Sequence, residues 1–306
     1  MTNPLWTLTL HGGAGGITRD VLTAEQDSAA RRGLSAALAA GSQVLAADGT
    51  ALDAVAAAVA VLEDDPPFNA GRGAVLTREG NISLDAAIMA GDRRAGAVAG
   101  VTATRNPVTL ARAVMDEGTH VFLAGEGADA FSLVHGLEQA GEAWFVTPER
   151  RRQLAELQAA GAGAFDVDMK YGTVGAVARD VQGHVAAATS TGGVTGKRWG
   201  RIGDSPVIGA GTWADEGCAV SCTGSGETFL RIGVAHAIAA RVRHLGEDAG
   251  TAAQAVLDEV VALGGTGGII VVTLDGNTAT RFSTKGMYRG HASSAAAPRV
   301  AIYGDE

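Results

Sequence analysis

The chain has 306 residues, of which 46% are hydrophobic and 19% charged, and its formal net charge is −9. This ordinary globular composition excludes a largely disordered chain, and the acidic balance argues against a nucleic-acid partner or an anionic membrane, because both require a basic surface. We find no signal peptide and no apolar stretch long enough to span a bilayer, so we expect a cytoplasmic protein.

The first half of the chain is predicted to mix strands with helices. A strand over 5–11 runs into the glycine-rich segment 11–16, and apolar stripes predict helices over 24–47 and from the N-cap Thr50 to Pro66. Short strands are expected around 74–77, 82–85, 97–103 and 119–124, with helices near 107–117 and 126–137.

Residues 148–171 differ in character from the segments on either side. A charged helix gives way to Gly and Ala and then to acidic residues without periodicity, which predicts an exposed, mobile connector over about 148–172. Two apolar strands joined by a Gly-His turn follow directly and predict a hairpin.

The rest of the chain continues the same mixture. Strands are expected over 206–214, 218–223, 268–274, 278–283 and 299–303, with helices over 226–244 and over 251–263. Because strands and helices are grouped rather than alternating, we predict an α+β domain of two stacked, mainly antiparallel sheets with helices outside. One domain should span 1–306, since neither side of the connector has enough strands for its own core. Cys218 and Cys222 are expected to be free and buried.

The dipeptide Gly172-Thr173 opens an apolar strand directly after the predicted connector. A threonine hydroxyl is a poor nucleophile unless a base lies beside it. A threonine at a chain N-terminus carries such a base, because its α-amine has a reference pKa of about 7.7–8.0. Breaking the Gly172–Thr173 bond would expose that amine. Taken alone, however, Thr173 is explained equally simply as a strand-forming threonine without any role.

Three further segments carry polar groups at predicted turns. Thr191 ends the second strand of the hairpin, where pairing brings its hydroxyl near Thr173. Arg201 and Asp204 lie three residues apart in a Gly/Pro loop, so they can bind the carboxylate and the ammonium of an amino acid. An ordinary hydroxyl-rich turn and a surface ion pair are the simpler explanations of each segment taken alone.

Two glycine-rich loops complete the set. Thr223 and Gly224 precede a predicted helix that begins near Gly226, where backbone N–H groups can stabilise an oxyanion. Asn69 lies in a loop after the Pro66-Pro67 pair, where its amide can hold a hydroxyl or position a chain.

Taken together and in this order, these segments resemble one family, the plant-type (type III) L-asparaginases/isoaspartyl peptidases, which are threonine-type N-terminal-nucleophile hydrolases. The segments that carry the resemblance are HGGAGG, LEDDPPFNAGRGAVLT, SLDAAIMAG, GTVGAVARD, AAATSTGG, GRIGDSPVIGAG, SCTGSGE, LGGTGGII and GMYRG. They cover nearly the whole chain except the connector, and as a set they are highly specific.

The resemblance implies an αββα sandwich that cleaves itself into an α subunit, 1–172, and a β subunit, 173–306, which assemble as an (αβ)₂ heterotetramer. It implies hydrolysis of asparagine and of β-aspartyl dipeptides as small-molecule substrates, with no catalytic cofactor. The implied catalytic residues are Thr173 as nucleophile, Thr191 beside it, Thr223 and Gly224 as oxyanion hole, and Asn69. Arg201, Asp204, Thr223, Gly224 and Gly226 are the implied substrate-binding residues.

The resemblance also implies a structural sodium ion bound by backbone carbonyls in the loop after the second helix. The matching residues are Leu62, Glu63, Asp65, Phe68, Ala70 and Arg72. Trp199 and Trp213 depart from the family pattern, which often has Pro and Tyr there, so they put the preference for leaving groups in doubt.

Two alternatives stay open. A glycosylasparaginase uses the same chemistry but usually has Asp before its nucleophile, where this chain has Gly172. A nucleotide-binding protein is suggested by the GxGxxA pattern at 209–214, but a strand and not a helix is predicted to follow it, and 192–197 lacks the Walker spacing.

Overall fold

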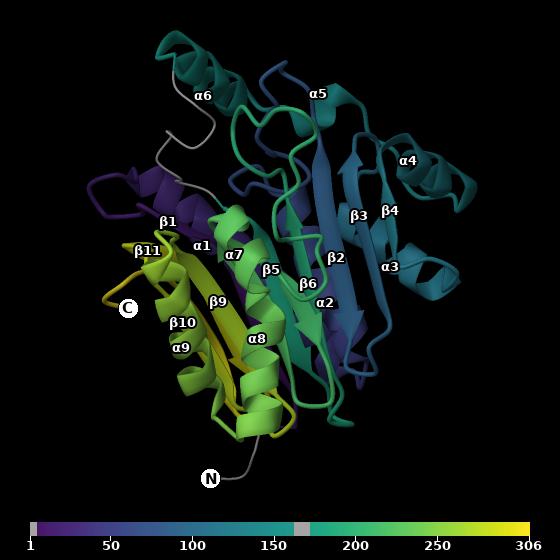
Figure 1. Cartoon of the computed structure of the whole chain (residues 1–306), viewed down its shortest axis with the longest axis vertical. Helices are drawn as coiled ribbons and strands as arrows, with labels where there is room; N and C mark the ends of the chain where they lie inside the picture. The colour runs from purple at the N-terminus through teal and green to yellow at the C-terminus, as the bar shows by residue number, and fades with distance from the viewer. Residues whose placement is uncertain (1–4, 162–171) are drawn as a thin grey trace.

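The computed structural model describes residues 5–161 and 172–306 (Figure 1). The first half contains β1 (Thr7–Gly15), α1 (Ala24–Ala46), α2 (Ala51–Asp64), β2 (Leu84–Ala90), β3 (Ala95–Val101), α3 (Pro107–Glu117), β4 (Phe122–Ala124), α4 (Gly125–Val134), α5 (Glu142–Phe145) and α6 (Pro148–Ala159). The second half contains β5 (Val174–Arg179), β6 (Val185–Thr191), β7 (Thr212–Ala214), β8 (Cys218–Gly224), α7 (Gly226–Ile232), α8 (Val234–Ala240), a π-helical turn (Arg241–Leu245), α9 (Ala249–Ala262), β9 (Gly267–Thr273), β10 (Thr278–Phe282), β11 (Gly286–Ser293) and β12 (Ala296–Tyr303).

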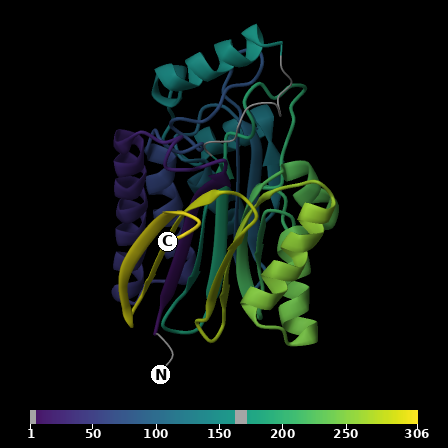
Figure 2. The same cartoon turned by 90° about the vertical axis from the view of Figure 1, so that its left-hand side faces the viewer.

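These strands form two stacked sheets. The larger has the order β12-β11-β1-β5-β6-β2-β3-β4 and the smaller β10-β9-β8-β7. Of the pairs within them, only β3 and β4 run parallel. Figure 2 shows the layers edge-on: the purple helices α1 and α2 cover one side, the sheets lie in the middle, and the green helices α7 to α9 cover the other side. The predicted α+β sandwich with helices outside is confirmed.

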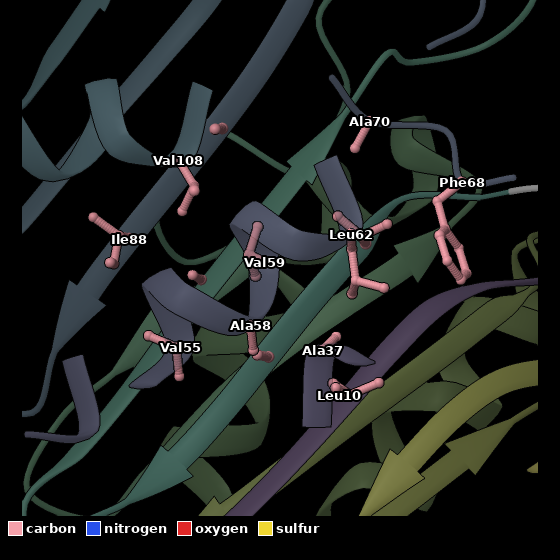
Figure 3. Packing of buried hydrophobic residues seen from close by; sticks show 14 of the residues in the cluster. Leu10, Ala37, Val55, Ala58, Val59, Leu62, Phe68, Ala70, Ile88 and Val108 are labelled. Carbon is pink, nitrogen blue, oxygen red and sulfur yellow. The ribbon is translucent and has the colours of Figure 1, made fainter. Parts of the chain in front are cut away.

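Apolar side chains fill all three spaces between the layers. Val55, Val59 and Leu62 of α2 pack toward the central strands of the large sheet (Figure 3). Val177 of β5 and Ile270 of β9 lie in the core between the two sheets. Because β5 and β6 are covered on both faces, their side chains are almost entirely buried, which explains why both strands are apolar throughout instead of alternating.

Several predicted boundaries were wrong. The strand predicted to end at residue 11 continues through the glycine-rich segment to Gly15, residues 74–77 form only an isolated bridge at Thr77, and 206–214 yields only the short β7. The helix expected over 226–244 breaks at Gly233, whose left-handed backbone (φ 69°) caps α7. The last helix begins two residues before the predicted Thr251, because Asp248 accepts the first free N–H groups.

The predicted connector begins with the charged helix that the sequence indicates. Over 148–159 the chain forms α6, and this helix buries Leu154, Leu157 and Arg150. The Arg150 guanidinium donates to the carbonyl of Gly73 at 2.5 Å, which joins α6 to the loop after α2. The expectation that 148–159 is exposed was therefore wrong for these three residues, because sparse apolar positions in a charged helix hid its buried face. The rest of the connector, 162–171, lies outside the described residues.

Two smaller expectations concern cysteines and membranes. Cys218 and Cys222, both on β8, are free and buried, as predicted. None of the helices within 5–161 and 172–306 is both long and apolar enough to cross a bilayer.

Candidate active site

Thr173 lies directly before β5, between the ends of β1 and β6, and is almost completely buried. Its hydroxyl donates to Thr191 Oγ1 at 3.0 Å and lies 3.4 Å from Ser205 Oγ. The pairing of β5 with β6, in which Val174 faces Ser190, explains this contact, because one further step brings Thr173 opposite Thr191. The hairpin therefore joins the two threonines as predicted.

The turn after β6 holds Thr191 in place. Thr191 Oγ1 also accepts the N–H of Gly193 at 2.9 Å. Asn69 supports the same turn, because its amide donates to the Gly193 carbonyl at 2.8 Å while its Oδ1 accepts from Val75 N at 2.9 Å. Asn69 does not line the pocket around Thr173, and its geometry is that of a residue that positions Thr191 and the turn.

A pocket opens in front of Thr173. It is lined by Gly172, Thr173, Thr191, Gly193, Val194, Arg201, Gly203, Asp204, Ser205, Thr223 and Gly224. Residues as far apart in the sequence as Gly172 and Gly224 thus meet here through strand pairing and the loop after β6. Small residues line much of the pocket, and its polar groups are hydroxyls, one guanidinium and one carboxylate.

Gly172 is held where no side chain fits. A Cβ built on it would lie 2.8 Å from Thr223 Oγ1, and one on Gly13 would lie 2.4 Å from the Gly172 nitrogen. Gly13 has a φ of 107°, which favours glycine as well. Thr223 Oγ1 is buried and has no hydrogen-bond partner among the described residues. A buried hydroxyl without a partner, aimed at Gly172, is available to a reacting carbonyl.

Arg201 and Asp204 line the same pocket as Thr223. Arg201 forms a two-bond ion pair with Glu227, each bond 2.9 Å long, so its guanidinium plane is fixed. A Cβ on Gly226 would lie 2.7 Å from Arg201 Nη2 and 3.1 Å from Asp204 Oδ1, so this glycine leaves room for both groups.

Asp204 is the least satisfied charged group of the pocket. Its Oδ2 is buried and has no hydrogen-bond partner among the described residues. Burial raises the pKa of this carboxyl to about 7, against smaller opposite effects of a backbone hydrogen bond and of Arg201. A ligand ammonium in the pocket would supply both the missing hydrogen bond and the missing positive charge.

Comparison with known proteins is consistent with this geometry. A family model described as Asparaginase matches residues 4–302. The chain belongs to the asparaginase family. An isoaspartyl peptidase of Salmonella typhimurium is 45% identical over 97% of this chain and 98% of that protein. An isoaspartyl peptidase of Escherichia coli is 45% identical over 97% and 95%, and a probable isoaspartyl peptidase/L-asparaginase of Arabidopsis thaliana is 38% identical over 97% and 99%.

Two features of this asparaginase-family chain bear on the other expectations. The GxGxxA pattern at 209–214 is followed by the strand β8, not by a helix, so the geometry of a dinucleotide site is missing there. Trp199 and Trp213 do not line the pocket: Trp199 is 94% exposed, and Trp213 packs edge-on against His236. Neither indole reaches the described pocket, so a direct effect on the leaving group is not supported.

Sequence reasoning missed several residues around the site. Ser205 follows Asp204 in the same loop and lies near the Thr173 hydroxyl, while His11 contacts the Thr173 carbonyl from β1. Both lie in segments that had been singled out for their glycines, so position within those segments was the available signal.

A buried ion pair, also missed, supports the loop that carries Arg201. Lys197 is 2% exposed, its Nζ donates to the Ser83 carbonyl at 2.7 Å, and it lies 3.8 Å from Asp85 Oδ2. Asp85 also accepts from Gly100 N at 2.9 Å and pairs with Thr191 across β2 and β6. Burial raises the pKa of Asp85 and lowers that of Lys197. Each residue therefore depends on its partner to remain charged.

Replacing Lys197 by Met is expected to destabilise the protein by about 3–5 kcal/mol, because Asp85 is left buried without its counter-charge. Urea unfolding followed by circular dichroism measures this loss. The double variant Lys197→Met/Asp85→Asn should recover part of it, since no unpaired charge remains. Equal losses in the single and double variants would contradict this explanation.

Proposed function

We propose that this chain is an isoaspartyl peptidase/L-asparaginase that cleaves its own Gly172–Thr173 bond and then uses Thr173 as an N-terminal nucleophile. The single observation that carries the proposal is the Thr173 hydroxyl, held at 3.0 Å by Thr191 in a pocket that also contains the unsatisfied Thr223 hydroxyl and Asp204 carboxylate. The names of the relatives support the choice of β-aspartyl substrates.

In the first reaction the Thr173 hydroxyl attacks the carbonyl carbon of Gly172. The C–N bond breaks, which frees the Thr173 amine and leaves Gly172 joined to Thr173 Oγ as an ester. Water then hydrolyses that ester to the Gly172 carboxylate and the Thr173 hydroxyl. Glycine at 172 supports this step, because a side chain there would collide with Gly13 and Thr223.

In the second reaction the free amine takes the proton of its own hydroxyl, which attacks the side-chain carbonyl of asparagine or of a β-aspartyl dipeptide. The positively charged Arg201 binds the substrate α-carboxylate, and the negatively charged Asp204 binds the substrate α-ammonium. Thr223 and the N–H of Gly224 stabilise the oxyanion, and one such donor typically contributes a factor of about 10²–10³ in kcat. Ammonia or an amino acid leaves, and water releases aspartate.

Intact mass measured under denaturing conditions tests the first reaction, and aspartate release from β-Asp-Leu and from asparagine tests the second. We expect two polypeptides, 1–172 and 173–306, and turnover of both substrates. Glycosylated asparagine serves as the third substrate, since preference for it would favour the glycosylasparaginase alternative. Full activity from an uncut chain would overturn the proposal.

The proposal extends to the assembly and the compartment. By resemblance to its family, the cleaved protein should form an (αβ)₂ heterotetramer, which light scattering during size-exclusion chromatography measures. Its two free, buried cysteines are compatible with the reducing cytoplasm.

A sodium ion bound by the loop after α2 is also part of the proposal. The carbonyls of Leu62, Glu63 and Asp65 each accept one backbone N–H and keep a second lone pair, so they fit such a ligand set. Phe68, Ala70 and Arg72 would supply the remaining carbonyls. Burial raises the pKa of the Glu63 carboxyl to about 8, so at pH 7 this side chain is mostly neutral and adds little charge.

Exchange of sodium for tetramethylammonium at equal ionic strength should lower the Tm of the protein. At a sodium concentration ten times its Kd, binding to the folded state alone contributes about 1.4 kcal/mol of stability. Differential scanning calorimetry measures the shift, with the same exchange in potassium as a test of selectivity. An identical Tm in all three salts would exclude a stabilising sodium site.

A further inference from the structure

His11 is a fully buried imidazole that the proposed reactions do not use. Its Nδ1 lies 3.0 Å from the carbonyl oxygen of Thr173, and its Nε2 lies 2.9 Å from Ser221 Oγ. Since a carbonyl only accepts, Nδ1 must carry the hydrogen. Burial lowers the pKa of His11 to about 3, although the bond to Thr173 opposes this, so the ring is neutral and its Nε2 must accept.

The tautomer of His11 is supported by a chain of buried hydroxyls. Ser221 must donate to His11 Nε2, so it has only lone pairs left for Thr189, whose Oγ1 lies 2.7 Å away. Thr189 accepts from Thr212, again at 2.7 Å, and its own hydrogen can be donated either to Ser221 or to the Gly211 carbonyl, 3.2 Å away. When Thr189 donates to Ser221, the bonds of this chain are aligned toward His11, and hydrogen bonds aligned in one direction polarise one another.

Glycine at position 175 makes room for this chain. Gly175 faces His11 across β1 and β5, and a Cβ there would lie 2.5 Å from His11 Nε2 and 2.1 Å from Ser221 Oγ. The contact between His11 and Ser221 thus occupies the space of a side chain in the middle of a sheet. Because the contact between His11 and Ser221 requires a glycine at position 175, it indicates a specific role for His11.

This role concerns the carbonyl of Thr173. The pairing of β1 with β5 stops at His11 and Gly175, so Thr173 lies beyond the last paired residue. The imidazole takes the place of the missing backbone donor. Once the Gly172–Thr173 bond is cut, Thr173 is attached to the chain only through this carbonyl side.

We propose that His11, oriented by Ser221 and Thr189, is a positioning residue that holds the Thr173 carbonyl so that the freed terminal amino alcohol keeps its reactive geometry after cleavage. This inference rests on the proposed function. In the uncut chain Thr173 is held from both sides, whereas in the mature enzyme the His11 contact replaces one of the two attachments. Its loss should therefore impair turnover more than self-cleavage.

The experiment compares His11→Leu, His11→Asn and Ser221→Ala with the wild-type enzyme. Asparagine can place an N–H near the position of Nδ1, so it preserves the bond to Thr173 while leucine removes it. His291→Leu is the matched control, because His291 makes a similar imidazole–hydroxyl contact with Thr9 on the same sheet but does not reach Thr173. Self-cleavage is followed on gels, and kcat and KM are measured with β-Asp-Leu on fully cleaved protein.

We expect kcat of His11→Leu to fall by about 30-fold or more, since sub-ångström misplacement of a reacting group is costly. KM should stay within about two-fold, because Arg201 and Asp204 are untouched. His11→Asn should recover most of kcat, and His291→Leu should keep it. A folded, cleaved His11→Leu enzyme with wild-type kcat, or an asparagine variant as slow as the leucine variant, would overturn the inference.

Nitrogen-15 NMR of the imidazole gives a readout that does not depend on catalysis. Between pH 5 and 9 we expect His11 as the neutral Nδ1–H tautomer, and a charged ring at pH 6 or an Nε2–H tautomer would overturn the inference. If His11→Leu does not fold, this spectrum and the kcat of Ser221→Ala test the inference in its place. Wild-type protein that neither cleaves itself nor hydrolyses its substrates would refute the proposed function, whatever the tautomer of His11.

Discussion

Replacement of Thr173 by alanine should leave a single polypeptide of 30.8 kDa and abolish hydrolysis of β-Asp-Leu. The hydroxyl is needed twice, first to break the bond to Gly172 and then to attack the substrate. Removing a nucleophile of this kind typically lowers kcat by a factor on the order of 10⁴–10⁶. A denaturing gel after prolonged incubation and an aspartate-release assay measure the two effects separately.

Thr173→Ser is the matched control, because it keeps a hydroxyl and should still yield two polypeptides. Substitution of Thr191 by Val removes the acceptor of the Thr173 hydroxyl without touching the nucleophile, so it should slow turnover and leave the fold intact. Two bands from Thr173→Ala would show that another residue starts the cleavage.

Asp204→Asn should lower kcat/KM by about 10²–10³, in the range found when one partner of a buried, hydrogen-bonded charge pair is removed. The carboxylate oxygen Oδ2 has no partner among the described residues, so we assign it to the substrate ammonium. Steady-state kinetics with β-Asp-Leu measure the loss. Asp215→Asn is the control, because Asp215 is equally buried but pairs with Arg243 away from the pocket.

The pH dependence of the enzyme should reflect the same carboxyl. With a pKa of about 7, Asp204 is half protonated near neutrality in the free enzyme, and the Thr173 amine must also be unprotonated. Log(kcat/KM) should therefore fall on the acid side with a slope approaching about 2. Log kcat should fall with a slope of about 1, because in the enzyme–substrate complex Asp204 is already paired with the substrate ammonium. Asp204→Asn should reduce the first slope to about 1, and an unchanged profile would exclude this assignment.

The Asp204→Asn variant should lose activity but gain stability. Because the folded-state pKa of Asp204 is raised above its ordinary value of 3.8, ionisation opposes folding increasingly between pH 4 and 7 and fully above pH 7. Asp204→Asn should therefore raise Tm more at pH 8 than at pH 4. Calorimetry at the two pH values measures this difference, and an equal Tm change at both would contradict it.

Regular periodicity was enough to predict the main helices and the central hairpin. The helices over 24–46 and 51–64 and the strands over 174–179 and 185–191 agree closely with the expected spans, because each shows one clear apolar pattern. The predictions for two other segments were wrong. Gly233 broke a helix whose stripe continued across it, and the buried face of 148–159 was hidden among charged residues.

The sequence by itself determined the chemical groups of the site and their approximate neighbours. Thr173 and Thr191 meet because a hairpin pairs nearby positions, and Arg201 and Asp204 share one loop. Strand pairing of this kind is local, so a sequence pattern can predict it.

Only the tertiary structure decided which distant groups reach this pair. The Thr223 hydroxyl, the His11 imidazole and the buried Lys197–Asp85 pair arrive there through the stacking of two sheets and through strand order. The unsatisfied state of Asp204, and hence its raised pKa, likewise follows from burial among neighbours far away in the chain. Burial and desolvation are sums over such neighbours, so no local pattern of residues specifies them.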